Sequence, residues 1–152
     1  MREHSQYLKV DLMSWVLGTI NKVEKGIRWN IAWQDTYREI GGEKPECGKK
    51  GCPMKAAETL YELGRIRGGN KSFNNLPLKK VVDNYSKNGA YAVLAIECLS
   101  QDSDTSTNEL WNAIRKRFKH ELGEDPATSD QGGTTLAYKL WHLGLIIESD
   151  SE

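Results

Sequence analysis

The sequence predicts an all-α protein, built from two tandem, related three-helix units that pack into one compact helical domain. Apolar residues recur every three or four positions over most of the 152-residue chain, a spacing typical of amphipathic helices. Glycines and capping residues separate these apolar segments, and no stretch alternates strictly between apolar and polar residues as a half-buried strand does.

Two parts of the chain align with each other, which indicates an internal repeat of residues 5–68 and 88–147. Trp33 aligns with Trp111 at an offset of 78, and Gly64 aligns with Gly144 at an offset of 80. Because units of this size bury little core alone, we expect them to pack together as one domain over residues 1–152.

The first unit contains three predicted helices. Apolar stripes over residues 8–23 and 29–40 predict two of them, the first ending near Gly26. The third covers residues 53–64 and follows the stretch "GKKGCP", where Pro53 suits the first helical position because no intrahelical bond needs its N–H. A loop, "IRGGNKSFNNLP", and a linking helix of about residues 76–87 follow.

The second unit repeats this organisation with clearer helix boundaries. A tyrosine- and alanine-rich helix ends in the polar run "SQDSDTSTN", and Ser106 with Glu109 forms a capping-box pattern at the start of the next helix. A loop of about ten residues separates that helix from the last one. The other residues expected at helix ends are Asn88, Gly123, either Thr134 or Thr135, and Gly144.

Composition indicates an ordinary soluble domain. The chain is 38% hydrophobic and 28% charged, as in typical globular proteins. Its longest apolar runs are a few residues, against roughly 20 for a membrane span, and no secretory signal pattern opens the chain. We therefore expect a cytoplasmic protein with no membrane partner.

The net charge of zero conceals an asymmetry between the two halves. Residues 1–90 hold sixteen basic and ten acidic residues, whereas residues 91–152 hold five and eleven. Much of the basic excess lies between Lys44 and Lys80, a segment that could attract an acidic protein or a nucleic acid. The alternatives are that it faces the acidic half of the same molecule or is merely solvated.

A second basic cluster lies between Arg115 and His120, on the helix that begins after Ser106. Its residues spread over more than half of the helix circumference, so we interpret them first as a solvated face paired with Glu109, Glu121 and Glu124. Nucleic-acid contact is the alternative interpretation.

The cysteines do not form a recognisable metal or disulfide pattern. Cys47, Cys52 and Cys98 make an odd count, which favours reduced thiols. A zinc site would need four ligands with paired spacings, and His120 and His142 are scattered singly. We expect no metal and no cofactor.

Four segments carry a resemblance to a known family. "KKGCPMKAAETLYELGRI", "NYSKNGAYAVLAIECL", "ELWNAI" and "LAYKLWHLGLI" are similar to an uncharacterised bacterial family of small helical proteins, of unknown function, whose signature is "KKGCP" at a helix start. The resemblance covers most of the chain from Trp29 onward. The chain departs from the family pattern at Ala57, where an aromatic residue is expected, and in the extra thiol of Cys47.

These observations favour a small intracellular, non-catalytic binding protein that engages an acidic protein or a nucleic acid through its basic central region. The candidate binding residues are Lys49, Lys50, Cys52, Lys55, Arg65, Arg67, Lys71, Lys79 and Lys80. The alternative is a thiol-dependent enzyme or redox switch at Cys52. Its thiol would lie near the positive end of a helix and two lysines, conditions that favour the thiolate.

Overall fold

A computed structural model describes the backbone of residues 11–42, 51–128 and 132–148, and the side chains of all of these except residues 51 and 52. The prediction of an all-α fold is confirmed. In these ranges the chain forms seven helices, and the only extended pairing is an isolated antiparallel bridge between Ile66 and Ile146. The helices are α1 Leu12–Glu24, α2 Trp29–Glu39, α4 Gly51–Glu62, α5 Leu78–Asn84, α6 Lys87–Gln101, α7 Thr107–Leu122 and α8 Gly133–His142.

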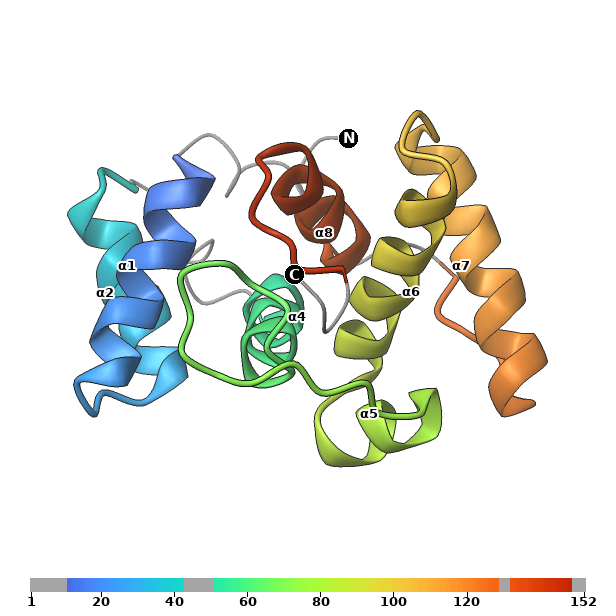
Figure 1. The fold of residues 1–152 in the computed structure, drawn as a ribbon, viewed down its shortest axis with the longest axis horizontal. Coiled ribbons are helices and arrows are strands. Elements are labelled where there is room, and N and C mark those ends of the chain that lie inside the picture. The colour runs from blue at the N-terminus through green and yellow to red at the C-terminus, as the bar shows by residue number, and fades with distance from the viewer. Residues whose placement is uncertain (1–10, 43–50, 129–131, 149–152) are drawn as a thin grey trace.

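Helix α6 is the central element of the fold. It packs against α4, α5, α7 and α8, and it is buried along most of its length. Figure 1 shows α1 and α2 side by side at one end of the molecule and α7 at the other, with α4 and α8 between the two ends. Helix α7 therefore has one face on the core and a broad face toward solvent.

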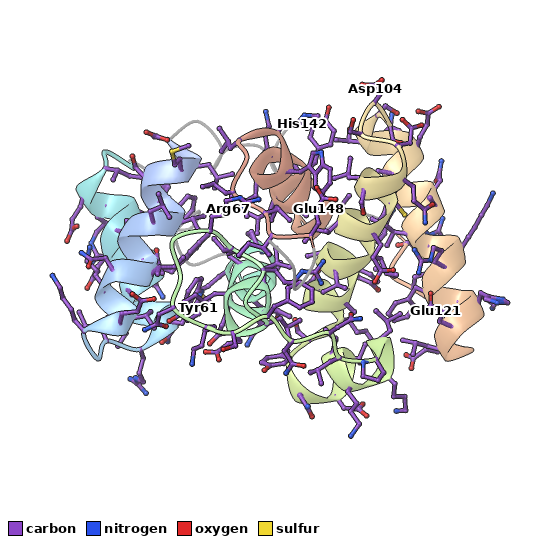
Figure 2. All side chains as sticks on the ribbon, viewed as in Figure 1. Tyr61, Arg67, Asp104, Glu121, His142 and Glu148 are labelled. Carbon is purple, nitrogen blue, oxygen red and sulfur yellow. The ribbon has the colours of Figure 1, made fainter. Side chains whose placement is uncertain are left out.

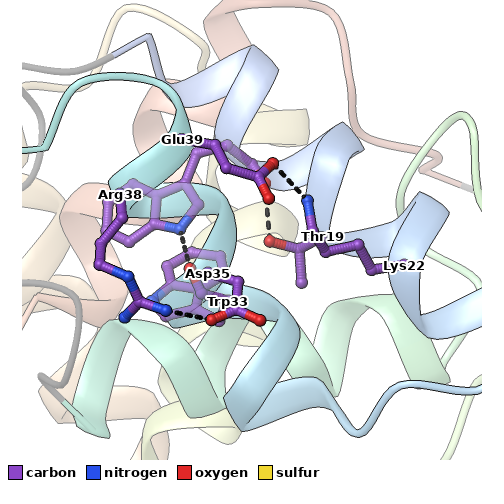
Figure 3. Close-up of polar contacts among 7 residues, drawn as sticks. Thr19, Lys22, Trp33, Asp35, Arg38 and Glu39 are labelled. Atoms are coloured by element: carbon purple, nitrogen blue, oxygen red, sulfur yellow. Dashed lines mark hydrogen bonds and ion pairs between the residues drawn. The ribbon is translucent and has the colours of Figure 1, made fainter.

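Aromatic side chains hold α1 against α2. The rings of Trp15 and Trp33 stack with their centroids 4.2 Å apart, and the Trp15 indole N–H donates to the Trp33 carbonyl at 2.8 Å. On the surface of the same pair, Lys22 bonds to Glu39 at 2.7 Å (Figure 3). An exposed ion pair of this kind contributes about 0–1 kcal/mol, so burial of the two indoles is the larger stabilising effect.

Several predicted helix boundaries agree with the structure. The Ser106 hydroxyl accepts from the Glu109 backbone N–H at 3.2 Å, and the Glu109 carboxylate accepts from the Ser106 N–H at 3.3 Å, so the capping box is confirmed. Gly123 ends α7 in the left-handed conformation. The linking helix exists but is shorter than expected, since α5 covers only Leu78–Asn84.

Two predicted N-caps are wrong. Ser86, not Asn88, caps α6, because its hydroxyl accepts from the Gly89 N–H at 2.9 Å. Helix α8 begins at Gly133, after Gly132 has turned the chain with a φ of 112°. Thr134 and Thr135 consequently lie inside the first turn of α8 and are buried.

Helix α4 also begins earlier than expected, at Gly51, which places Pro53 in the first turn but not at the first position. The first helix is described only from its cap, Asp11, whose carboxylate accepts from the Ser14 N–H at 3.3 Å. The expected turn before residue 11 lies outside the described residues.

The aligned ends of α4 and α8 have the same local geometry and meet in space. Gly64 and Gly144 both have positive φ, 70° and 76°. Each is followed by a residue whose N–H bonds back to the corresponding leucine carbonyl, at 2.8 Å in one case and 3.1 Å in the other. The bridge then joins Ile66 to Ile146, the next aligned pair. The wider repeat stays a prediction, since α6 is central whereas α1, the corresponding first helix, packs mainly on α2.

Candidate functional site

The predicted basic central region is only partly covered by the structure. Lys49 and Lys50 lie outside the described residues, as does the side chain of Cys52. Lys55 is exposed on α4, Arg67 and Lys71 are exposed on the loop that follows, and Lys79 and Lys80 are exposed on α5. The described cations therefore come from three consecutive segments.

Arg65 differs from the rest of this set because it is buried, with only 4% of its surface exposed. Its guanidinium lies over the Phe73 ring at 4.7 Å, and its Nε donates to the Ile147 carbonyl at 3.0 Å. These contacts fix the loop after α4 and the C-terminal segment to each other. Arg65 thus has a structural role in this fold.

Carboxylates lie beside Lys71 and Lys79. Lys71 lies 3.4 Å from Glu62, and Lys79 lies 3.2 Å from Asp83 on the next turn of α5. Each pair is exposed, so water and salt screen it and a competing anion could replace the carboxylate. The described part of the basic central region is a surface of mixed charge.

The structure places a groove of about 960 Å³ beside the second basic cluster. One wall is formed by the solvent face of α7, and the other by the loop that follows it. The α7 wall consists of Asn112, Arg115, Lys116, Lys119 and His120, and the loop wall of Asp125, Pro126 and Thr128.

The pattern of α7 explains why these side chains share one face. Leu110, Ile114 and Phe118 recur at intervals of four and are buried against α6. Residues two positions after each of these lie on the opposite side of the helix, and residues one position after lie on its flank. Two rows with four-residue spacing result: one begins at Asn112, and the other begins at Arg115.

Two contacts hold the loop wall in place. The Ala127 N–H donates to the Tyr91 hydroxyl at 2.9 Å, and the Tyr91 ring contacts Phe118 and Trp111 in the core. Across the groove, Lys119 bonds to Asp125 at 2.5 Å. The loop wall is thus held to the core at one point and to α7 at another by an exposed ion pair.

The charges of the groove favour an anion. Its lining holds three permanent cations and one carboxylate. The hydrogen bond from Lys119, then the charges of Lys119 and Arg115, lower the pKa of Asp125. In addition, the Arg115 Nε is buried and has no hydrogen-bond partner among the described residues, so a groove ligand with an acceptor oxygen could satisfy it.

Arg117 belongs to the same cluster in sequence but lies outside the groove. It bonds to Glu97 at 2.7 Å and to Glu121 at 2.8 Å. Burial opposes its charge, but these two carboxylates raise its pKa well above the ordinary value. Of the three expected carboxylate partners of the cluster, only Glu121 pairs with it. Glu109 serves the capping box, and Glu124 lies 3.3 Å from Lys87.

Residues 12–147 match a family of unknown function (DUF6979). The chain belongs to this family. The match includes all seven described helices and both walls of the groove. No curated protein and no solved structure matches the chain.

The family match also covers Cys98, the one cysteine whose side chain the structure describes. Cys98 is half-buried on α6, and this burial raises the pKa of its thiol, although Arg117 acts in the opposite direction. A thiol with a raised pKa carries less of the nucleophilic thiolate at neutral pH. Cys98 packs against the core, and its burial disfavours the reactive thiolate.

The described residues contain no cluster of metal ligands and no helix suited to a bilayer. No three His, Cys, Asp or Glu side chains there come together as metal ligands. None of the described helices combines the length and apolar character that a bilayer span requires.

Proposed function

We propose that this protein is a non-catalytic binding protein that engages an acidic partner, and that the α7 groove is its principal contact surface. One observation carries the proposal: Arg115, Lys116 and Lys119 line a single groove that contains one opposing carboxylate, Asp125. Such a surface gains charge-assisted hydrogen bonds when an anion enters. Lys119 can then donate to the ligand in place of Asp125.

The basic central region is the second surface of this proposal. Lys55, Lys71, Lys79 and Lys80 are exposed and could contact an extended acidic partner. The proposal also includes a cytoplasmic location, a bacterial family and "KKGCP" as the family's signature at the start of α4.

Charge reversal in the groove tests the proposal. In the double variant Lys116→Glu, Lys119→Glu, we expect affinity for anionic probes to fall by about tenfold or more, because hydrogen bonds to charged groups contribute about 1.5–3 kcal/mol. The probes are labelled random DNA and RNA pools and a labelled polyglutamate peptide. Fluorescence anisotropy measures binding across a salt series.

The matched control is Lys25→Glu, Arg28→Glu, which changes the net charge equally at exposed positions outside the groove. Both variants should keep the wild-type melting temperature within a few degrees, since they alter exposed side chains. A third variant, Lys79→Glu with Lys80→Glu, measures the share of the basic central region. Equal losses in groove and control variants would contradict a groove contact, and no binding to any probe at low salt would contradict the proposed function.

One observation keeps the thiol-dependent alternative open. Helix α4 begins at Gly51, which puts Cys52 in its first turn, where unpaired backbone N–H groups favour a thiolate. If Cys52 is reactive, iodoacetamide should label it in the folded protein faster than a model thiol at the same pH. Peptide mass spectrometry distinguishes it from Cys47 and Cys98. Labelling of Cys52 only after denaturation would eliminate this alternative.

A further inference from the structure

We propose that the α7 groove binds a single strand of nucleic acid, whose phosphates and unpaired bases contact the two donor rows of α7 while the loop wall lies on the other side of the strand. This inference rests on the proposed function, because it names the class of acidic partner. Four features of the groove support it: the spacing of its donors, its concave shape, its stacking surfaces and its single carboxylate.

The donors of α7 are spaced regularly along the groove. Asn112, Lys116 and His120 form one row, and Arg115 and Lys119 form the other. Four residues advance an α-helix by about 6 Å, so each row presents a donor at about that interval. An extended strand repeats its phosphate charge at an interval of the same order, and a cationic groove that tracks the backbone is the usual device of single-strand binding.

The shape of the site favours a single strand over a duplex. Helices that read duplex DNA protrude into a major groove about 12 Å wide. Here the cationic face of α7 is instead one side of a hollow, because the loop holding Asp125 and Pro126 forms the opposite wall. The volume, about 960 Å³, lies near the upper limit of pockets for drug-sized ligands, which suits a few nucleotides.

Flat groups for base stacking are also present. Imidazole rings and guanidinium planes stack on unpaired bases in RNA-binding proteins, and the groove contains His120 and Arg115. The Arg115 Nε additionally lacks a hydrogen-bond partner in the described part of the chain. A phosphate or base carbonyl oxygen would supply one.

Substitution of Asp125 tests the inference, because it should raise the affinity for a single strand. Its carboxylate forms an ion pair with Lys119 and would repel an incoming phosphate. Asp125→Asn keeps the size of the side chain, removes the negative charge and frees Lys119. Affinity for a single strand should therefore rise, by about twofold to fivefold for one surface charge partner.

The control is Asp104→Asn, which removes the same charge at an exposed position before α7. Figure 2 shows Asp104 at the opposite end of α7 from Glu121. Since the two variants have equal net charge, a general electrostatic effect would raise affinity equally in both. We expect Asp104→Asn to bind as the wild type does.

The experiment measures anisotropy of a labelled twelve-nucleotide single strand, as DNA and as RNA, the corresponding duplexes, and polyglutamate. We expect the single strand to bind at least about tenfold more tightly than the duplex, with a log-log salt slope near −2 for three phosphate contacts. Equal or tighter duplex binding would overturn the inference, as would an unchanged or weaker affinity of Asp125→Asn.

The outcomes separate this inference from the proposed function. Groove-dependent binding of polyglutamate without binding of any nucleic acid would overturn the single-strand inference and leave the acidic-partner proposal supported. No binding to any of these probes would overturn both.

Discussion

Replacing Gly64 by alanine is expected to destabilise the protein by roughly 2–5 kcal/mol, combining left-handed backbone strain with a steric clash. Gly64 has a φ of 70°, and a Cβ there would lie 2.3 Å from the Ser72 carbonyl oxygen and 2.5 Å from the Ser72 carbonyl carbon. Both are backbone atoms, so no side-chain rotation relieves the contact. The loop cannot withdraw freely either, because the Asn74 N–H bonds to the Leu63 carbonyl at 2.9 Å.

Gly144 provides the matched control, since it occupies the aligned position at the end of α8. Its φ is 76°, but a Cβ there would meet nothing within 4 Å. Gly144→Ala should therefore cost only the conformational strain, about 1–2 kcal/mol. Urea denaturation of both variants gives the difference. Equal losses at the two positions would show that the Ser72 contact has no energetic effect.

Gly64 and Gly144 also show which features of the helix ends can be predicted from the sequence alone. Their place after an apolar helical stripe identified both as helix ends, and both adopt the left-handed conformation. Such signals are local, because a helix end needs only its own last turn. The approach of Ser72 to Gly64 depends on how the loop folds back over α4, which no local pattern encodes.

The N-cap of α6 was predicted wrongly for a related reason. Asn88 and Ser86 are both good capping residues, and propensity alone does not choose between neighbours. The choice is made by packing: Gly89 lies against Thr59 of α4, and α6 starts early enough to bring that residue into the helix. Tertiary contact decided this boundary.

The groove was missed because it requires two segments to meet. Cationic residues between Arg115 and His120 were visible in the sequence, and their four-residue spacing could have been counted. The opposite wall depends on the hydrogen bond between Ala127 and Tyr91, two residues from different elements. A solvated helix face and one side of a groove have the same sequence pattern, and only the fold of the following loop distinguishes them.

The same packing of α4 on α6 sets two effects against each other at Gly89. Alanine is the better helix former by about 0.5–1 kcal/mol, so helix propensity predicts that Gly89→Ala stabilises the protein. Packing predicts the opposite, because a Cβ at this position would lie 2.3 Å from the Thr59 hydroxyl oxygen and 2.6 Å from the Thr59 Cβ. Thr59 is buried and its hydroxyl bonds to the Lys55 carbonyl, so it has little room to move.

We expect packing to win, with Gly89→Ala lowering the free energy of unfolding by about 1–3 kcal/mol, the usual range for overpacked cores. The compensating change is Thr59→Gly, since alanine at position 59 would keep the Cβ in contact. Thr59→Gly alone should destabilise the protein by about 1 kcal/mol or more, because it removes a buried side chain and glycine is a poorer helix former than threonine. When it is combined with Gly89→Ala, the new methyl group on α6 occupies space that the Thr59 side chain vacates on α4. The double variant should therefore be more stable than Gly89→Ala alone. Thermal denaturation of all four proteins measures this coupling; strictly additive losses, or a stabilised Gly89→Ala, would mean that α6 shifts away from α4 without penalty.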